Sequence, residues 1–155
     1  MKREDSLNED EVGKLLAIEE IKKLKARYFR YFDTKQWEDC RQLFTLDAWY
    51  VFESSGSRTE FDSRDSFIEN AKTRLGDAIT VHHGFMPEIE FDDATHAHGI
   101  WAMFDYVDIP GQSCQQGFGH YEETYRDDGQ GWRIASLRLS RLRIDVLPTR
   151  PERLS

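Results

Sequence analysis

An amphipathic helix is the first pattern along the chain. Between residues 13 and 33, apolar side chains recur every three or four positions, and glutamate and lysine occupy the opposite side. Pairs such as Glu19 and Lys23 add favourable charges one turn apart. The pattern stops near Asp33, and a second short helix is predicted after it. The apolar positions of the first helix are Ile18, Ile21, Leu24, Tyr28 and then Tyr31 or Phe32, and those of the second are Trp37, Cys40, Leu43 and Phe44.

Strand patterns dominate the rest of the chain. Residues 49–54, WYVFES, predict a strand, and the stretch SSGSR after them predicts a turn. A third helix is expected to begin at Ser63 or Asp65, either of which can cap it, and to end at Gly76. Four β segments follow at about 79–91, 96–108, 115–126 and 132–146, joined by the turn-rich connectors DDAT, IPGQS and RDDGQG.

This order of elements predicts an α+β fold. Helices followed by long antiparallel strands favour a cone-shaped barrel, in which N-terminal helices pack on one side of a strongly curved, mostly antiparallel sheet. Such a cone encloses an apolar cavity, where a ligand is expected to bind. We expect one domain over residues 13–147, a flexible polar N-terminus over 1–12 and a flexible tail over 148–155.

The composition and the net charge of the chain exclude some classes of binding partner. The chain has 155 residues, of which 39% are hydrophobic and 13% aromatic, as in a globular protein. Its net charge of −8 argues against binding to nucleic acid or to an anionic lipid surface. No apolar run approaches the roughly 20 residues that span a bilayer, and no signal-peptide pattern begins the sequence, so no membrane role is expected. Cys40 and Cys114 form no CxxC motif, which favours a reducing cytoplasm.

Two adjacent histidines stand near the start of the strand ITVHHGFMPEIEF at 79–91. A regular strand sends His82 and His83 to opposite faces of the sheet. Simple alternation groups His83 with the apolar residues of the strand, so on parity alone His83 should face inward. A bulge at Gly84 or Pro87 would reverse the parity, and His82 would then line the cavity while the later apolar residues pack inward. Both orientations stay open.

Four stretches of the chain together resemble a known family. They are IEEIKKLKARYFRYFDTKQWED, VHHGFMPEIEF, GIWAMFDYV and YEETYRDDGQGWRIASLRLSRLRI, and they extend from about Ile18 to Asp145. The combination is similar to the SnoaL-like branch of the nuclear transport factor 2-like superfamily, and closest in pattern to the bile-acid 7α-dehydratases. Scytalone dehydratase and hexachlorocyclohexane dehydrochlorinase are more distant relatives. The resemblance implies a cone-shaped α+β barrel and assembly as a homo-oligomer, a dimer or a trimer.

The resemblance also implies five site residues. Dehydratases of this family use an aspartate at the end of the first helix and a histidine at the start of the first long strand, which correspond to Asp33 and His82. A tyrosine before that aspartate corresponds to Tyr28 in ARYFR. An acidic residue in the next strand corresponds to Asp105. An arginine in the last strand corresponds to Arg141, in an arginine-rich repeat whose register is open by a residue or two.

These residue types suit a dehydration that begins beside a carbonyl group. A His–Asp pair supplies a base and the carboxylate that orients it, and a tyrosine hydroxyl can stabilise the enolate oxygen. The imidazolium can then return its proton to the departing hydroxyl, so the scheme needs neither a metal nor an organic cofactor. We therefore expect a lyase that acts on a small hydrophobic molecule, a polycyclic or aromatic hydroxy-carbonyl compound.

Two alternative functions stay open beside this one. An isomerase or a polyketide cyclase would use the same base and oxyanion donor without a leaving group. A non-catalytic module of the same fold would bind a small ligand or pair with an oxygenase subunit, because a fold does not settle a function.

The candidate residues also have structural interpretations. Asp33 could cap the second helix, Tyr28 could be a core residue, and Arg141 could form surface or interface ion pairs. An inward-facing Asp105 favours a polar site, since buried acids are rare without a partner. The remaining histidines, His96, His98 and His120, are expected on solvent-exposed faces. His96 and His98 directly follow the turn DDAT, and a third metal ligand at a diagnostic spacing is missing.

Overall fold

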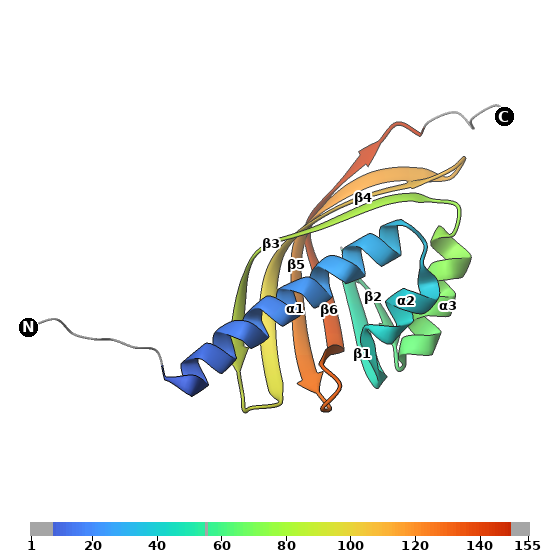
Figure 1. Cartoon of the computed structure of the whole chain (residues 1–155). Helices are drawn as coiled ribbons and strands as arrows, with labels where there is room; N and C mark the ends of the chain where they lie inside the picture. Colours follow the sequence, from blue (N-terminus) through green and yellow to red (C-terminus); the bar gives the residue numbers. More distant parts are fainter. Residues whose placement is uncertain (1–7, 55, 150–155) are drawn as a thin grey trace, which may run out of the picture.

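The computed structural model describes residues 8–54 and 56–149. Within these residues the elements are α1 (Glu9–Asp33), α2 (Trp37–Gln42), β1 (Phe44–Ser54), β2 (Ser57–Phe61), α3 (Arg64–Leu75), β3 (Ile79–Phe91), β4 (His96–Ile109), β5 (Ser113–Asp127) and β6 (Trp132–Leu147). The strands form one sheet in the order β2-β1-β6-β5-β4-β3, with β1 and β6 parallel and the other neighbours antiparallel. Figure 1 shows the helices on one side of this curved sheet. The expected α+β class is confirmed, although the sheet does not close into a barrel.

The first helix begins at Glu9, earlier than the apolar pattern predicted. Asn8 caps α1 in a capping box: its side chain accepts from the Glu11 amide at 2.9 Å, and the Glu11 carboxylate accepts from the Asn8 amide at 2.9 Å. Acidic residues in the first turn also stabilise the start of a helix. Residues 9–12 of the expected flexible N-terminus are therefore helical. Residues 1–7, and residues 150–155 of the expected flexible tail, lie outside the described part of the chain.

The hairpin of β1 and β2 differs from the expected elements. β1 begins at Phe44 and not at residue 49, and β2 pairs with it where a turn was predicted. Gly56 has a φ of 85°, a left-handed conformation that lets the chain reverse between the two strands. Residues 57–60 of β2 are exposed, and β2 is an edge strand. No apolar alternation therefore marks β2 in the sequence.

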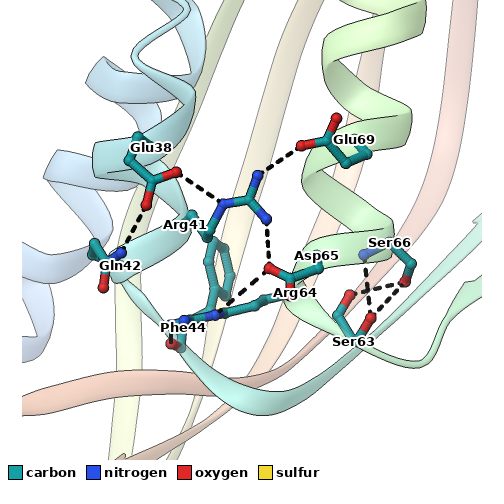
Figure 2. A network of polar contacts seen from close by, with 9 residues as sticks. All are labelled: Glu38, Arg41, Gln42, Phe44, Ser63, Arg64, Asp65, Ser66 and Glu69. Carbon is teal, nitrogen blue, oxygen red and sulfur yellow. Dashed lines mark hydrogen bonds and ion pairs between the residues drawn. The ribbon is translucent and has the colours of Figure 1, made fainter.

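α3 begins at the expected cap and is tied to α2 by an arginine. Ser63 accepts a hydrogen bond from the Ser66 amide at 3.2 Å, as an N-cap does. Figure 2 shows Arg41 of α2 reaching across to two carboxylates of α3. It pairs with Asp65, and its Nη2 lies 2.7 Å from Glu69 Oε1. This network links α3 to α2, and α3 covers one end of the sheet.

A buried ion pair joins α1 to the middle of the sheet. The Lys25 side chain is fully buried and pairs with Glu123 of β5. Its ammonium lies 3.6 Å from the centre of the Tyr121 ring and 4.5 Å from that of Tyr28. The Tyr125 hydroxyl donates to the second Glu123 oxygen at 2.6 Å. Burial lowers the pKa of Lys25, and the Glu123 charge opposes this effect. The pair therefore satisfies both charges inside the core and holds α1 in one position along β5.

A bulge in β3 decides between the two adjacent histidines. The pairing of β3 with β4 shifts after Phe85, where Met86 has a φ of 43°. Before the bulge, His82 faces the helices and contacts α1, and His83 lies on the outer face, where its ring packs 5.7 Å from that of Phe85. After the bulge, Ile89 packs against the core. The parity reversal considered from the sequence therefore exists, and His82 is the inward residue.

Both cysteines are buried and unpaired in the described part of the chain. Burial raises the pKa of the Cys40 thiol to about 12, so this thiol stays protonated and packs as a small apolar side chain. None of the helices that the structure describes combines the length and the apolar composition needed to cross a membrane.

Gly119 of β5 leaves no room for a side chain. A Cβ atom there would lie 1.9 Å from the backbone oxygen of Ser140 in β6, beside a shift in the pairing of the two strands. We predict that Gly119→Ala lowers the free energy of unfolding by about 2–3 kcal/mol, because β5 and β6 must separate locally. Urea denaturation followed by circular dichroism measures the change.

Gly13→Ala is the matched control. Nothing lies within 4 Å of a Cβ atom at Gly13, which is exposed on α1. Alanine favours a helix over glycine by up to about 1 kcal/mol, so stability should stay equal or rise. Unchanged stability in Gly119→Ala would contradict the close approach of the two strands.

Candidate active site

A cavity of about 270 Å³ lies between the helices and the inner face of the sheet. Its walls come from α1, from α3 and from each strand of the sheet. Much of the wall is apolar, with contributions from Phe32, Phe52, Phe61, Phe67 and Leu139. The sequence-predicted residues that line it are Tyr28, His82, Asp105 and Arg141, and the fifth, Asp33, contacts His82.

Asp33 and His82 form a dyad in which His82 lines the cavity and Asp33 contacts its ring. Asp33 is the last residue of α1, and its Oδ1 lies 2.6 Å from Nδ1 of His82. Its Oδ2 accepts from the His82 backbone amide at 2.8 Å, so one carboxylate holds both the strand and the ring. An ionised carboxylate can only accept, so Nδ1 carries a proton, and in the neutral imidazole Nε2 then holds the lone pair. Asp33 does not cap α2, whose N-cap residue is Gln36.

A short chain of donors supports the dyad, and the sequence analysis missed it. Thr80 donates from its hydroxyl to Asp33 Oδ1 at 3.0 Å, and Lys35 donates to the Thr80 oxygen at 2.9 Å. Burial lowers the pKa of Lys35, while the Asp33 charge opposes this effect. The hydroxyl and the ammonium thus form a chain of donors that ends at the Asp33 carboxylate. The available signal was the spacing of Thr80 and His82, which places both side chains on one strand face.

A second polar pair lies in the same cavity. Nη1 of Arg141 donates to Oδ1 of Asp105 at 2.8 Å, and Nη2 donates to Oδ2 at 2.5 Å. The Asp105 side chain is 2% exposed and that of Arg141 is 13% exposed. Burial alone would lower the pKa of Arg141, but the hydrogen bonds and charge of Asp105 raise it. A Cβ atom at Gly117 would lie 1.8 Å from Nη1, so this glycine makes room for the pair.

The register of the arginine-rich repeat is now defined. The side chains of Arg138 and Arg143 are 42% and 72% exposed, and they pair with Glu53 and Asp145. Arg141 points the other way, into the cavity. The interpretation of Arg141 as a surface or interface residue is therefore wrong.

Two tyrosine hydroxyls belong to the cavity wall. Tyr28 and Tyr121 both line the cavity and are 3% and 1% exposed. Burial raises the pKa of both hydroxyls well above the usual value, so both remain protonated donors. The Tyr121 hydroxyl is buried and has no hydrogen-bond partner among the described residues, a costly state that a ligand or water can relieve. Sequence reasoning missed Tyr121 because its alternation in YEETY is that of a core strand.

The remaining histidines lie away from the cavity. His120 is half-buried and follows the strand alternation to the face opposite Tyr121. His96 and His98 are exposed side chains that contact Asp93 and Asp92 at 3.0 Å and 3.1 Å. Among the residues that the structure describes, no three side chains of His, Cys, Asp or Glu converge as a metal site would require.

Comparison with known proteins identifies the family. The sequence profile of the SnoaL-like domain matches residues 13–138. The chain belongs to the SnoaL-like domain family. A similar protein in sequence is the probable cyclase FGR4 of Gibberella zeae, which is 23% identical over 133 residues, or 79% of this chain and 89% of the cyclase. The resemblance noted from the motifs is thus confirmed at the level of the family.

Solved structures of other proteins share this SnoaL-like fold. A type 2 hexachlorocyclohexane dehydrochlorinase, LinA, matches with a TM-score of 0.77 and 17% identity, over 90% of this chain and 95% of LinA. A scytalone dehydratase-like protein of Novosphingobium aromaticivorans matches with a TM-score of 0.75 and 17% identity, over 92% of this chain and 97% of its own. At this identity the similarities establish the fold alone.

Removing one partner of the Arg141–Asp105 pair should cost much stability. Arg141→Met keeps an apolar stem but leaves Asp105 buried without its cation. We expect the free energy of unfolding to fall by about 3 kcal/mol. Urea denaturation at neutral pH measures the loss.

Arg143→Met is the control for charge alone. It removes the same charge two residues further along β6, from a side chain that is 72% exposed. Exposed ion pairs contribute little, so stability should hardly change. A similar loss in both variants would contradict the special role of the buried pair.

Proposed function

We propose that this SnoaL-like protein is a lyase that needs no cofactor and removes water from a hydrophobic hydroxy-carbonyl compound. The observation that carries the proposal is the Asp33–His82 dyad beside an apolar cavity. Protonated Tyr28 and Tyr121 stand in the same wall and can donate to a developing oxyanion. The similarity in fold to a dehydrochlorinase and to a scytalone dehydratase-like protein supports an elimination reaction.

His82 is the proposed general base. Its Nε2 takes a proton from the carbon beside the carbonyl group, and the electrons of the broken C–H bond pass into an enolate. Asp33 stabilises the imidazolium through the 2.6 Å contact to Nδ1. Tyr28, with Tyr121 as a second donor, hydrogen-bonds the enolate oxygen. The reaction then needs a route for the hydroxyl group to leave.

The same imidazolium completes the elimination. The enolate forms a carbon–carbon double bond, the C–O bond of the β-hydroxyl breaks, and the Nε2 proton passes to the leaving oxygen to give water. Because one imidazole removes and returns the proton, both bonds break on one face of the substrate. Asp105 holds Arg141 rigid in the cavity wall, and we assign this pair to the orientation of the hydroxyl group.

Isomerisation or polyketide cyclisation is the second candidate function. The similarity to the cyclase FGR4 favours it. The same base and the same tyrosines would act, but no hydroxyl group would leave. Mass spectrometry of the product separates the candidates, because dehydration removes one water and isomerisation leaves the mass unchanged.

We predict that His82→Ala and Asp33→Asn each lower turnover by about 10²–10⁴-fold. The first change removes the base, and the second removes the carboxylate that orients it. Substrates are first sought among steroids, phenolics and polyketide-like ketones by thermal shift, since ligands of the folded state raise its melting temperature. Turnover of the hits is then followed by mass spectrometry.

His83→Ala is the matched control for this experiment. It removes the neighbouring imidazole, which lies on the outer face of the sheet, so turnover should persist. Circular dichroism confirms that each variant folds. Full activity in both His82→Ala and Asp33→Asn would contradict the catalytic role of the dyad.

We also propose that the outer face of the sheet forms the contact of a homo-oligomer. Neighbouring rings cluster there with centres 5.4–5.9 Å apart, from His83, Phe85, Phe104 and Phe118. Phe85 is 49% exposed and Phe118 is 36% exposed. Contiguous exposed aromatic patches are typical of contacts between protein subunits.

Light scattering after size exclusion tests this contact. The wild-type protein should have a mass that is a multiple of 18.3 kDa, and Phe85→Ser with Phe118→Ser should reduce it to that of one chain. Leu15→Ser with Leu16→Ser is the control, because it removes two exposed apolar side chains from α1. An unchanged mass in the double phenylalanine variant would exclude this face.

A further inference from the structure

The residues that α3 contributes to the cavity wall change from aromatic to polar along the helix. Near the start of the helix, the Phe67 ring lies 6.2 Å from that of Phe32, which in turn packs 4.9 Å from the imidazole of His82. Arg74 follows seven residues later, which is a rise of about 10 Å along the helix. Asn70 and Arg74, one turn apart on a single face, both line the cavity. The cavity therefore extends from the dyad to the C-terminal end of α3.

The tip of the β4–β5 hairpin forms the opposite wall of this outer end. Ile109 lies four residues beyond Asp105 on the inward face of β4, roughly 13 Å along the strand. It pairs with Ser113 beside the turn, and Ser113 and Gln115 line the cavity from β5. Figure 1 shows the hairpin tip at the same end of the molecule as the C-terminal end of α3. This end of the cavity therefore combines the polar side chains of α3 and β5 with apolar neighbours such as Leu75 and Ile109.

Arg74 gives the cavity wall a net positive charge. The charged lining residues that the structure describes are Asp105, Arg141 and Arg74, and the first two pair with each other. Two arginines and one aspartate sum to +1, whereas the whole chain carries −8. Arg74 is exposed at the end of α3, and among the described residues its guanidinium has no ion-pair or hydrogen-bond partner, although most arginines of the structure have one. The Asn70 amide is likewise without a partner there.

We propose that the cavity binds an apolar molecule that carries an anionic group, and that Arg74 and Asn70 bind this anion at the C-terminal end of α3. A guanidinium donates charge-assisted hydrogen bonds to the oxygens of a carboxylate, a sulfonate or a phosphate, and an amide adds a neutral donor. A neutral apolar ligand would cover the guanidinium without giving it a partner. The inference specifies a substrate class for the proposed lyase, and it rests on that function in placing the reacting carbon at His82.

Two dyes that differ by one anionic group test the proposal. 1-Anilinonaphthalene-8-sulfonate and N-phenyl-1-naphthylamine share one apolar body, and both fluoresce more strongly in apolar surroundings. We expect the wild-type protein to bind the sulfonated dye more tightly. Arg74→Gln should weaken binding of the sulfonated dye by about fivefold or more and should leave the Kd of the neutral dye within about twofold. Fluorescence titration measures both dissociation constants.

Two variants separate charge at the cavity from charge elsewhere. Lys72→Gln removes the same charge from the last turn of α3, from a residue that is exposed like Arg74 but does not line the cavity, so both dyes should bind it as they bind the wild type. Arg74→Lys keeps the charge and should retain most of the preference. Salt should reduce the wild-type preference, because the anion site is partly exposed. Equal effects of Arg74→Gln and Lys72→Gln, or an equal loss for both dyes, overturn the proposal.

The dye experiment and the turnover experiment can fail separately, because dye binding requires no reaction. A preference that depends on Arg74 in a protein whose turnover survives His82→Ala supports the anion site and rejects the dyad. Loss of turnover in His82→Ala without any dependence on Arg74 keeps the lyase and rejects the anion site.

Discussion

The buried ion pair between Lys25 and Glu123 fixes the helix on which the candidate site depends. Both side chains are fully buried, so neither charge tolerates the loss of its partner. Lys25 precedes Asp33 by eight residues on the same helix, and a slip of α1 by one turn would carry Asp33 about 5.4 Å along the helix axis. The contact of Asp33 with His82 is only 2.6 Å long. The charge pair in the core therefore sets the geometry of the dyad at the end of the helix.

Two irregular features of the strands also position the side chains of the candidate site. The bulge at Met86 reverses the alternation of β3, so that a histidine faces the cavity while the later apolar residues still face the core. In β5, Gly117 leaves the space that the guanidinium of Arg141 occupies. Both features weaken regular strand packing locally, since a bulge disrupts the ladder and glycine has no side chain to pack. They place His82 and Arg141 on the inner face of the sheet, beside the apolar residues of the core.

The cavity brings these groups together with the polar side chains of α3. The dyad and the tyrosines stand among aromatic rings, and a hydrogen bond in such apolar surroundings is stronger than in water. The other end, between α3 and the β4–β5 hairpin, adds polar side chains and the guanidinium of Arg74, which has no partner among the residues that the structure describes. The family supplies the scaffold, and the residues of the wall specify which ligand it accepts. An amphiphilic ligand matches both ends of this space.

The sequence by itself determined α1, α3 and the four long strands, because each of them carries its own apolar periodicity or cap. It also supplied the residue types of the site through the family resemblance. It did not reveal β2, an exposed edge strand without alternation, or the support of the dyad by Thr80 and Lys35. Only the tertiary structure decided that His82 faces inward and that Arg141 pairs with Asp105. A bulge and a contact between distant strands produce these two results, and both depend on how the segments approach one another in space.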